Sequence, residues 1–132
     1  MSQYLLDTHI LLWWADDSGR LSSICRSLLE DGENQMFVSA VSVWEVSIKV
    51  SQRKLSIPLE PLPFFQKLIA ENQFNPLPIT LTHAAGVFRL PKVHNDPFDR
   101  LLISQARLEG LSLVSEDAVF EKYELPGLIG RG

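Results

Sequence analysis

Four short stretches of the sequence, each rich in apolar residues, alternate with segments long enough to form helices. They cover residues 3–6, 36–38, 76–79 and 111–114. Strands that are apolar on both faces are typical of a mainly parallel sheet with helices on either side. The pattern therefore predicts an α/β fold, a three-layer α/β/α sandwich around a mainly parallel sheet. That sheet has four strands, or five if residues 126–132 add one.

The segments between these strands carry helix signals. Val41, Trp44 and Ile48 follow the spacing of one helix face, and Gly110 ends the clearest helix of the chain. We expect Trp14 and Trp44 to pack in the core, although aromatic rings can also stack on nucleic-acid bases. The predicted helices cover residues 10–15, 21–29, 41–52, 64–72, 96–107 and 116–123, with a short one from Thr80 or Thr82 to Phe88.

Length and composition narrow the class of protein. A chain of 132 residues without a linker or repeat predicts a single domain over residues 1–132. Cys25 is the only cysteine, and the first residues lack the basic segment of a signal peptide. No stretch approaches the roughly 20 apolar residues of a membrane span. We therefore expect a cytoplasmic protein that does not contact a membrane.

The net charge is −4, from 12 basic and 16 acidic residues. This balance argues against binding nucleic acid through overall charge, which needs local positive potential. It does not exclude a nuclease, because divalent metal bound at an acidic site inverts the local charge.

Four carboxylates lie where predicted strands lead into helices. Asp7 follows the first strand, Glu45 and Asp99 lie in the opening turns of their helices, and Asp117 comes three residues after Val114. In sheets of this kind, ligands bind beyond the carboxyl ends of the strands. We therefore expect the four acids to converge at one edge of the sheet.

Each acid alone also fits a structural role at a helix start. Asp7 suits an N-cap, and Glu45 has the spacing from Ser42 of a capping box. Asp96 before a proline fits an N-cap that places Asp99 in the first helical turn. Asp117 fits the first turn after a cap at Ser115.

The combination of four acids favours a metal site over four separate caps. Four carboxylates at one edge repel one another unless a cation neutralises them. Oxygen ligands without histidine or cysteine suit Mg²⁺ or Mn²⁺, which also bind phosphate oxygens. Such a site can promote in-line hydrolysis of a phosphodiester with one or two ions.

Four segments of the sequence resemble the signature regions of PIN domains, and among these the VapC-type toxins of bacterial toxin–antitoxin pairs. They span nearly the whole chain in the order of the family: YLLDTHILLWW, VSAVSVWEVSIKV, HNDPFDRLLISQA and LSLVSEDAVFEKY. The resemblance implies an endoribonuclease that uses Mg²⁺ or Mn²⁺, has RNA as its substrate, binds a cognate antitoxin and forms a homodimer. The residues that it places at the metal and catalytic site are Asp7, Glu45, Asp99 and Asp117.

The resemblance also implies roles for neighbouring residues. Ser115 stands where the family often carries a hydroxyl residue that holds a water or the substrate phosphate, and Asp96 becomes an outer-shell partner. Arg100 is a candidate for guiding the RNA backbone, against a default role on a solvated helix face. Glu116 is a second acid beside Asp117.

Three other functions compete with this interpretation. A phospho-accepting receiver domain needs an acceptor Asp after a mid-chain strand, and no Asp occurs between Asp31 and Asp96. A PIN-like module that binds without cutting would not need all four acids. A DNA-directed nuclease would use the same metal chemistry, so only substrate competition separates it from a ribonuclease.

Overall fold

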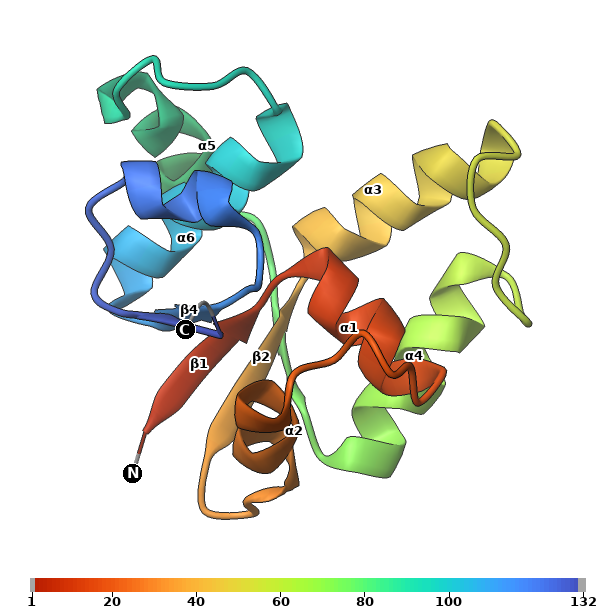
Figure 1. Ribbon diagram of the computed structural model, residues 1–132. Helices are drawn as coiled ribbons and strands as arrows, with labels where there is room; N and C mark the ends of the chain where they lie inside the picture. Colours follow the sequence, from red (N-terminus) through yellow and green to blue (C-terminus); the bar gives the residue numbers. More distant parts are fainter. Residues whose placement is uncertain (1, 131–132) are drawn as a thin grey trace.

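The computed structural model describes residues 2–130, and these form one five-stranded sheet with helices on both faces (Figure 1). The strand order is β3-β2-β1-β4-β5, and every neighbouring pair is parallel. The strands are β1 (Gln3–Leu6), β2 (Gln35–Ser39), β3 (Asn75–Leu77), β4 (Ser112–Val114) and β5 (Leu128–Ile129). The predicted α/β sandwich is confirmed, with the fifth strand present.

The helices connect successive strands and cover the sheet. They are α1 (Thr8–Ala15), α2 (Ser23–Glu30), α3 (Ala40–Ser51), α4 (Pro61–Asn72), α5 (Leu81–Gly86) and α6 (Pro97–Glu109), with 3₁₀ turns η1 (Val87–Arg89) and η2 (Ala118–Lys122). Gly110 ends α6 in the left-handed conformation, with φ of 68°, which glycine adopts without steric cost.

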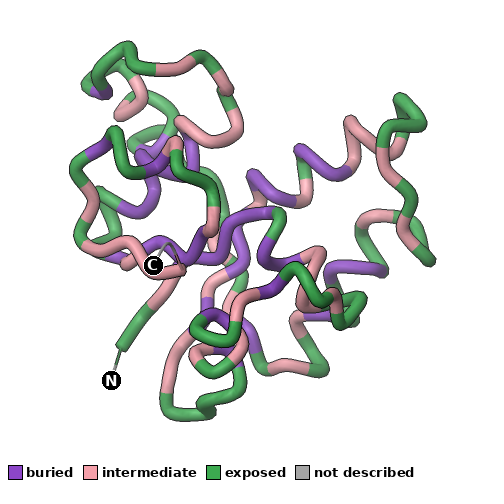
Figure 2. The backbone as a smooth tube through the Cα atoms, in the orientation of Figure 1, coloured by how far each residue is buried: buried purple, intermediate pink, exposed green. Residues whose placement is uncertain are grey.

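Alternate residues of each central strand enter two separate cores. Leu6, Val38 and Val114 pack with α1, α2 and α4 on one face of the sheet. Leu5 and Leu113 pack with α6 and η2 on the other face. Figure 2 shows the buried stretches running along the central strands and the inner sides of the helices. Burial on both faces explains why the strands are apolar throughout.

Several predicted element bounds are corrected by the structure. Helix α4 begins at Pro61, three residues earlier than predicted, because proline fits the first helical turn, where the N–H groups have no partner within the helix. The predicted helix over residues 116–123 is only the 3₁₀ turn η2, in which Tyr123 N donates to Phe120 O over three residues. Strand β3 lies at the sheet edge, which explains how it accommodates Pro76.

The prediction that Trp44 packs in the core is wrong. Trp44 is 46% exposed, because Val41, Ser42 and Glu45 occupy the buried face of α3. Its ring meets Phe98 edge-on, with centroids 4.7 Å apart. Trp14 is partly buried, as predicted, against the first core, the one that the sheet forms with α1, α2 and α4. Its Nε1 donates to Asn72 Oδ1 at 3.0 Å.

The carboxyl ends of β1, β2 and β4 point toward the same edge of the sheet, because the three strands are parallel neighbours. Helices α1 and α3 and the turn η2 all begin there. Among residues 2–130, the structure contains no helix with the length and apolar character that crossing a membrane requires.

Candidate metal centre at the carboxyl edge of the sheet

Asp7 lies between β1 and α1 and is buried, with 3% exposure. Although it occupies the N-cap position of α1, its side chain makes no capping hydrogen bond. Its carboxylate instead accepts a hydrogen bond from Ser115 Oγ, with 2.7 Å between Asp7 Oδ2 and Ser115 Oγ. The Asp7 side chain therefore does not cap α1.

Glu45 lies in the second turn of α3 and is 4% exposed. The cap of α3 is Ser39, whose Oγ accepts from Val41 N at 2.9 Å, so a capping box between Ser42 and Glu45 does not form. The Glu45 carboxylate pairs with Lys49 one turn later, with 2.5 Å between Oε2 and Nζ. Glu45 is therefore buried beside the sheet edge without serving the helix start.

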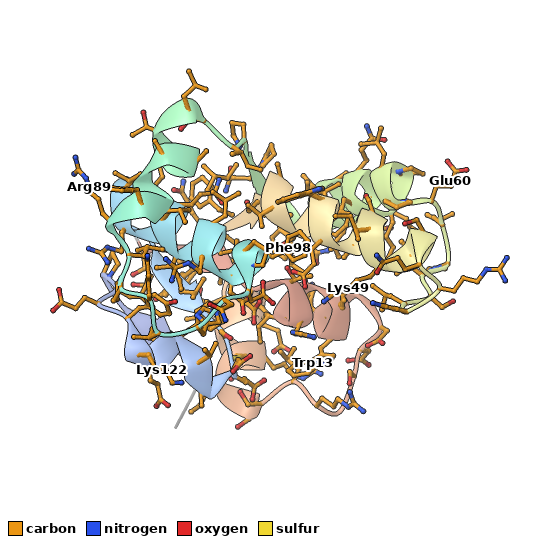
Figure 3. The ribbon with its side chains drawn as sticks, turned by 90° about the horizontal axis from the view of Figure 1, so that it is seen from above. Trp13, Lys49, Glu60, Arg89, Phe98 and Lys122 are labelled. Atoms are coloured by element: carbon orange, nitrogen blue, oxygen red, sulfur yellow. The ribbon has the colours of Figure 1, made fainter. Side chains whose placement is uncertain are left out.

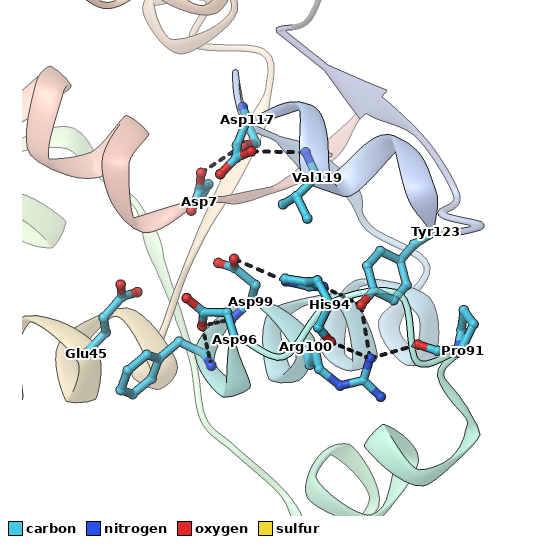
Figure 4. Close-up of polar contacts among 12 residues, drawn as sticks. Asp7, Glu45, Pro91, His94, Asp96, Asp99, Arg100, Asp117, Val119 and Tyr123 are labelled. Atoms are coloured by element: carbon cyan, nitrogen blue, oxygen red, sulfur yellow. Dashed lines mark hydrogen bonds and ion pairs between the residues drawn. The ribbon is translucent and has the colours of Figure 1, made fainter.

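Asp96 and Asp99 have different roles at the start of α6. Asp96 is the N-cap, and its Oδ1 accepts from Phe98 N at 2.9 Å and from Asp99 N at 3.0 Å. This cap leaves the Asp99 carboxylate free of the helix backbone, and Figure 4 shows it between Asp96 and Asp7. The predicted arrangement, with Asp96 as cap and Asp99 in the first turn, is present.

Asp117 and Ser115 join the site from the segment after β4. Ser115 is fully buried, donates to Asp7 and accepts from Asp117 N at 3.1 Å, so it ties the two acids together. Asp117 is the N-cap of η2 through Val119 N, at 3.0 Å. Glu116 turns away, because its Oε2 accepts from Ser22 N at the start of α2.

The electrostatics show that the acids share one environment. Burial, followed by the charges of Asp96, Asp7, Glu45 and Asp117, raises the pKa of Asp99 to about 8. Burial also raises the pKa of Asp7, against the lowering effect of the Ser115 hydrogen bond. Negative charge is therefore unfavourable at this edge of the sheet unless a cation compensates it.

Lys49, on α3 (Figure 3), supplies part of that compensation. Partial burial favours a lower pKa for Lys49, but the hydrogen bond and charge of Glu45 and the charges of Asp96 and Asp99 outweigh it, and the net pKa is raised. This role of Lys49 was not predicted, although the spacing of Glu45 and Lys49, four residues apart on a helix, was the available signal.

The donor set fits a hard divalent cation in chemistry, since every acid offers carboxylate oxygens. Within residues 2–130, no three His, Cys, Asp or Glu side chains are already grouped as a metal cage. The repulsion that raises the pKa of Asp99 also favours separated carboxylates, and a cation is what would draw them together.

Arg100 is not brought into the carboxylate cluster. Its Nη1 donates to Pro91 O at 2.8 Å and to Tyr123 Oη at 3.0 Å, and Figure 4 shows the guanidinium on the far side of His94 from Asp99. His94 instead faces the site, with 3.4 Å between Nε2 and Asp99 Oδ2. The signal available in the sequence was the position of His94 near the Asp96 turn, five residues before Asp99. The contact of His94 with Tyr123 had no such signal, because it spans 29 residues.

The fold and the site together define a class: an α/β protein with a carboxylate cluster at the carboxyl edge of a parallel sheet. The PIN domain family model matches residues 4–125 of the chain. The chain therefore belongs to the PIN domain family, as its sequence motifs predict. It is 30% identical over 127 residues to Ribonuclease VapC22 of Mycobacterium tuberculosis, covering 96% of this chain and 95% of that one.

Solved structures support the same fold. VapBC2 from Rickettsia felis, bound to a DNA fragment from its promoter, includes a chain with a TM-score of 0.70 at 14% identity, covering 96% of this chain and 97% of that chain. A toxin–antitoxin complex from Klebsiella pneumoniae gives a TM-score of 0.64 at 20% identity, covering 96% and 95%.

Proposed function

We propose that this protein is a divalent-metal-dependent endoribonuclease and the toxin of a toxin–antitoxin pair. One observation carries the proposal: Asp7, Glu45, Asp99 and Asp117 come from four separate segments, and the charges of the other three act on Asp99 at one edge of the sheet. The membership in the PIN domain family and the similarity to a relative named as a ribonuclease support the same reaction.

The four carboxylates would hold Mg²⁺ or Mn²⁺. When bound, such an ion supplies charge neutralisation at a phosphodiester and lowers the pKa of a bound water. Asp7, at the N-cap position of α1, and Glu45, in α3, are buried and would offer their carboxylate oxygens to the ion. Asp99 comes from the first turn of α6 and Asp117 from the start of η2, and Ser115 holds Asp7 in place through its hydroxyl.

Ser115 is assigned a positioning role in this proposal. Its hydroxyl hydrogen is directed to Asp7, and its oxygen accepts from the backbone of Asp117. Because both contacts are within the protein, Ser115 supports the acids before any substrate binds.

Cleavage of a labelled single-stranded RNA tests the proposal. Purified protein is assayed with Mg²⁺, Mn²⁺ or EDTA, beside Asp99→Asn and the matched control Asp16→Asn, which changes an exposed acid at the end of α1. We expect metal-dependent cutting by the wild type and by Asp16→Asn, and none by Asp99→Asn. Cutting that persists in Asp99→Asn, or in EDTA, would contradict the proposal.

RNA rather than DNA is the proposed substrate. Unlabelled single-stranded DNA and RNA are added as competitors in the same assay. We expect RNA to compete at lower concentration than DNA of the same sequence. Equal competition would turn the proposal toward a general nuclease.

The biological partners follow from the toxin assignment. The proteins of the similar structures are described as VapBC or toxin–antitoxin complexes, which supports a cognate antitoxin for this chain. Expression of the wild type in the bacterial cytoplasm, its expected location, should arrest growth, and expression of Asp99→Asn should not.

A homodimer is the last part of the proposal. Leu81 on α5 and Phe88 on η1 are 91% and 93% exposed, which is unusual for large apolar side chains. A second copy that covers them would bury this apolar surface. Sedimentation analysis should show a dimer for the wild type and a shift toward monomer for Phe88→Ser. A monomeric wild type would contradict the proposed homodimer.

A further inference from the structure

A chain of hydrogen bonds leads from Arg100 to the carboxylate of Asp99. Arg100 Nη1 lies 3.0 Å from Tyr123 Oη, Tyr123 Oη lies 2.5 Å from His94 Nδ1, and His94 Nε2 lies 3.4 Å from Asp99 Oδ2 (Figure 4). It connects α6, the loop before α6, and the end of η2. None of these three side chains is part of the carboxylate cluster.

The direction of each hydrogen bond follows from the chemistry of its donor. A guanidinium has only donors, so Arg100 donates to the phenol oxygen of Tyr123. The phenol then has one hydrogen left, and His94 Nδ1 is the acceptor beside it. Tyr123 is 7% exposed, so sending that hydrogen elsewhere would leave a buried donor without a partner.

These contacts determine which ring nitrogen of neutral His94 carries the hydrogen. A neutral imidazole that accepts at Nδ1 carries its hydrogen on Nε2. His94 Nε2 faces Asp99 Oδ2, which accepts a hydrogen bond. The opposite tautomer would point a nitrogen lone pair at carboxylate oxygen and a hydrogen at the phenol. Both ends of the imidazole therefore favour hydrogen on Nε2.

Arg100 also fixes the loop that carries His94. Its guanidinium donates to the carbonyl oxygens of Pro91 at 2.8 Å and of His94 at 3.4 Å. His94 is also held by its ring, which meets Tyr123 edge-on with centroids 5.4 Å apart. The side chain of His94 is 15% exposed and that of Asp99 is 18% exposed, so solvent competes only weakly for the contact.

We infer that His94 is a positioning residue, which holds the Asp99 carboxylate toward the other acids through Nε2–H, with its tautomer set by Tyr123 and Arg100. As a role in the metal site, this inference rests on the proposed function. The tautomer itself does not, because it follows from hydrogen bonds within the protein. Outer-shell partners that orient ligands in this way typically change metal affinity about 10- to 100-fold when removed.

The tautomer of His94 is the primary test. The chain has three histidines, so ¹⁵N spectra of histidine-labelled protein, compared with those of His94→Gln, assign the His94 signals. They are recorded without metal above about pH 8, where the Asp99 carboxyl, whose pKa is raised to about 8, is ionised and accepts a hydrogen bond. We expect the chemical shifts of an imidazole with hydrogen on Nε2. Hydrogen on Nδ1 would overturn the inference.

Tyr123→Phe tests the control of the tautomer by the phenol. It keeps the ring against His94 and removes only the hydroxyl, and Tyr4→Phe is the matched control because Tyr4 lies in β1, in the first core. We expect Tyr123→Phe to give a mixture of tautomers and about 10-fold weaker Mn²⁺ binding, while Tyr4→Phe behaves as the wild type. An unchanged tautomer and unchanged Mn²⁺ affinity in Tyr123→Phe would contradict the positioning role.

The two proposals fail in distinguishable ways. If the wild type neither binds Mn²⁺ nor cuts RNA, the proposed function fails, and the tautomer still reports on the hydrogen-bond chain. If the wild type cuts RNA but carries hydrogen on His94 Nδ1, only the positioning role fails.

Discussion

Asp7 and Glu45 differ from Asp96 and Asp117 in what their carboxylates contact, although all four lie at the start of a helix or turn. Asp96 and Asp117 accept hydrogen bonds from backbone N–H groups of the element that follows. The Asp7 carboxylate accepts from the Ser115 hydroxyl, the Glu45 carboxylate accepts from the Lys49 ammonium, and the two residues are 3% and 4% exposed. A buried carboxylate that does not cap its helix has another role, because its burial costs free energy.

This difference separates structural from functional acids. A capping carboxylate contributes to stability whether or not a cation is present. A buried carboxylate beside other acids opposes folding until its charge is compensated. Asp99 belongs with Asp7 and Glu45, since Asp96 already caps α6, whereas Asp117 both caps η2 and contributes charge to Asp99.

The largest effect is expected from neutralising the acids that do not cap. Asp7→Asn and Asp99→Asn should each lower the rate of RNA cleavage by more than about 100-fold, because loss of a ligand exceeds loss of an outer-shell partner. Thermal unfolding in EDTA should show no loss of stability for Asp99→Asn. A variant that loses stability while its folded fraction keeps full activity would show that the substituted acid has a structural role and is not needed for cleavage.

The pH dependence of stability is expected to follow the raised pKa of Asp99. Because folding raises this pKa from 3.8 to about 8, folding favours the protonated carboxyl. The resulting stability is present below the ordinary pKa and is lost as pH rises through about 8. In EDTA, the unfolding temperature of the wild type should therefore fall relative to Asp99→Asn across this window.

Bound metal should offset this decrease in the unfolding temperature. Added Mg²⁺ should raise the unfolding temperature of the wild type more at pH 9 than at pH 5, since a bound cation compensates the ionised carboxylate. An Asp99→Asn protein with the same pH profile as the wild type would show that Asp99 is not the group responsible.

A smaller effect is expected from the capping acid Asp96. Asp96→Ala should lower the free energy of unfolding by about 1 kcal/mol, and Asp96→Asn should not, because Asn caps a helix as well as Asp does. Chemical denaturation measures both. If Asp96→Asn instead abolishes RNA cleavage while preserving stability, Asp96 belongs with the functional acids and the distinction between the two groups fails.

The smallest effect is expected at Lys49. Lys49→Gln should lower the free energy of unfolding by about 0.2–0.5 kcal/mol, which is typical of a helical pair four residues apart. It should also strengthen Mn²⁺ binding, because a positive charge beside the Glu45 carboxylate is removed. Weaker Mn²⁺ binding would mean that Lys49 orients Glu45 for the metal.

Much of the fold could be predicted because its signals are local. The apolar strands, the proline and glycine that bound α6, and the Thr80 cap of α5 all lie within a few residues of the elements they define. The outward position of Trp44 could not be predicted, because Val41, Trp44 and Ile48 share a helical spacing with more than one choice of buried face. The structure buries Glu45, which belongs to the carboxylate cluster, and its neighbour Trp44 lies on the exposed side of α3.

The carboxylate cluster was predictable because parallel strands bring their carboxyl ends to one edge. Its supporting contacts were not. Ser115 reaches Asp7 over 108 residues of sequence, and His94 reaches Tyr123 over 29. Arg100 looked like a free cation beside a proposed ligand, and only the folded loop shows that its guanidinium binds carbonyl oxygens.

The most direct test of a shared metal site is anomalous diffraction from crystals soaked in Mn²⁺. We predict an anomalous peak within coordination distance of Asp99 and at least one of Asp7, Glu45 and Asp117, and no peak there in crystals of Asp99→Asn. Ordered carboxylates with no peak among them at saturating Mn²⁺, or a peak elsewhere on the chain alone, would contradict the assignment of these acids to one metal.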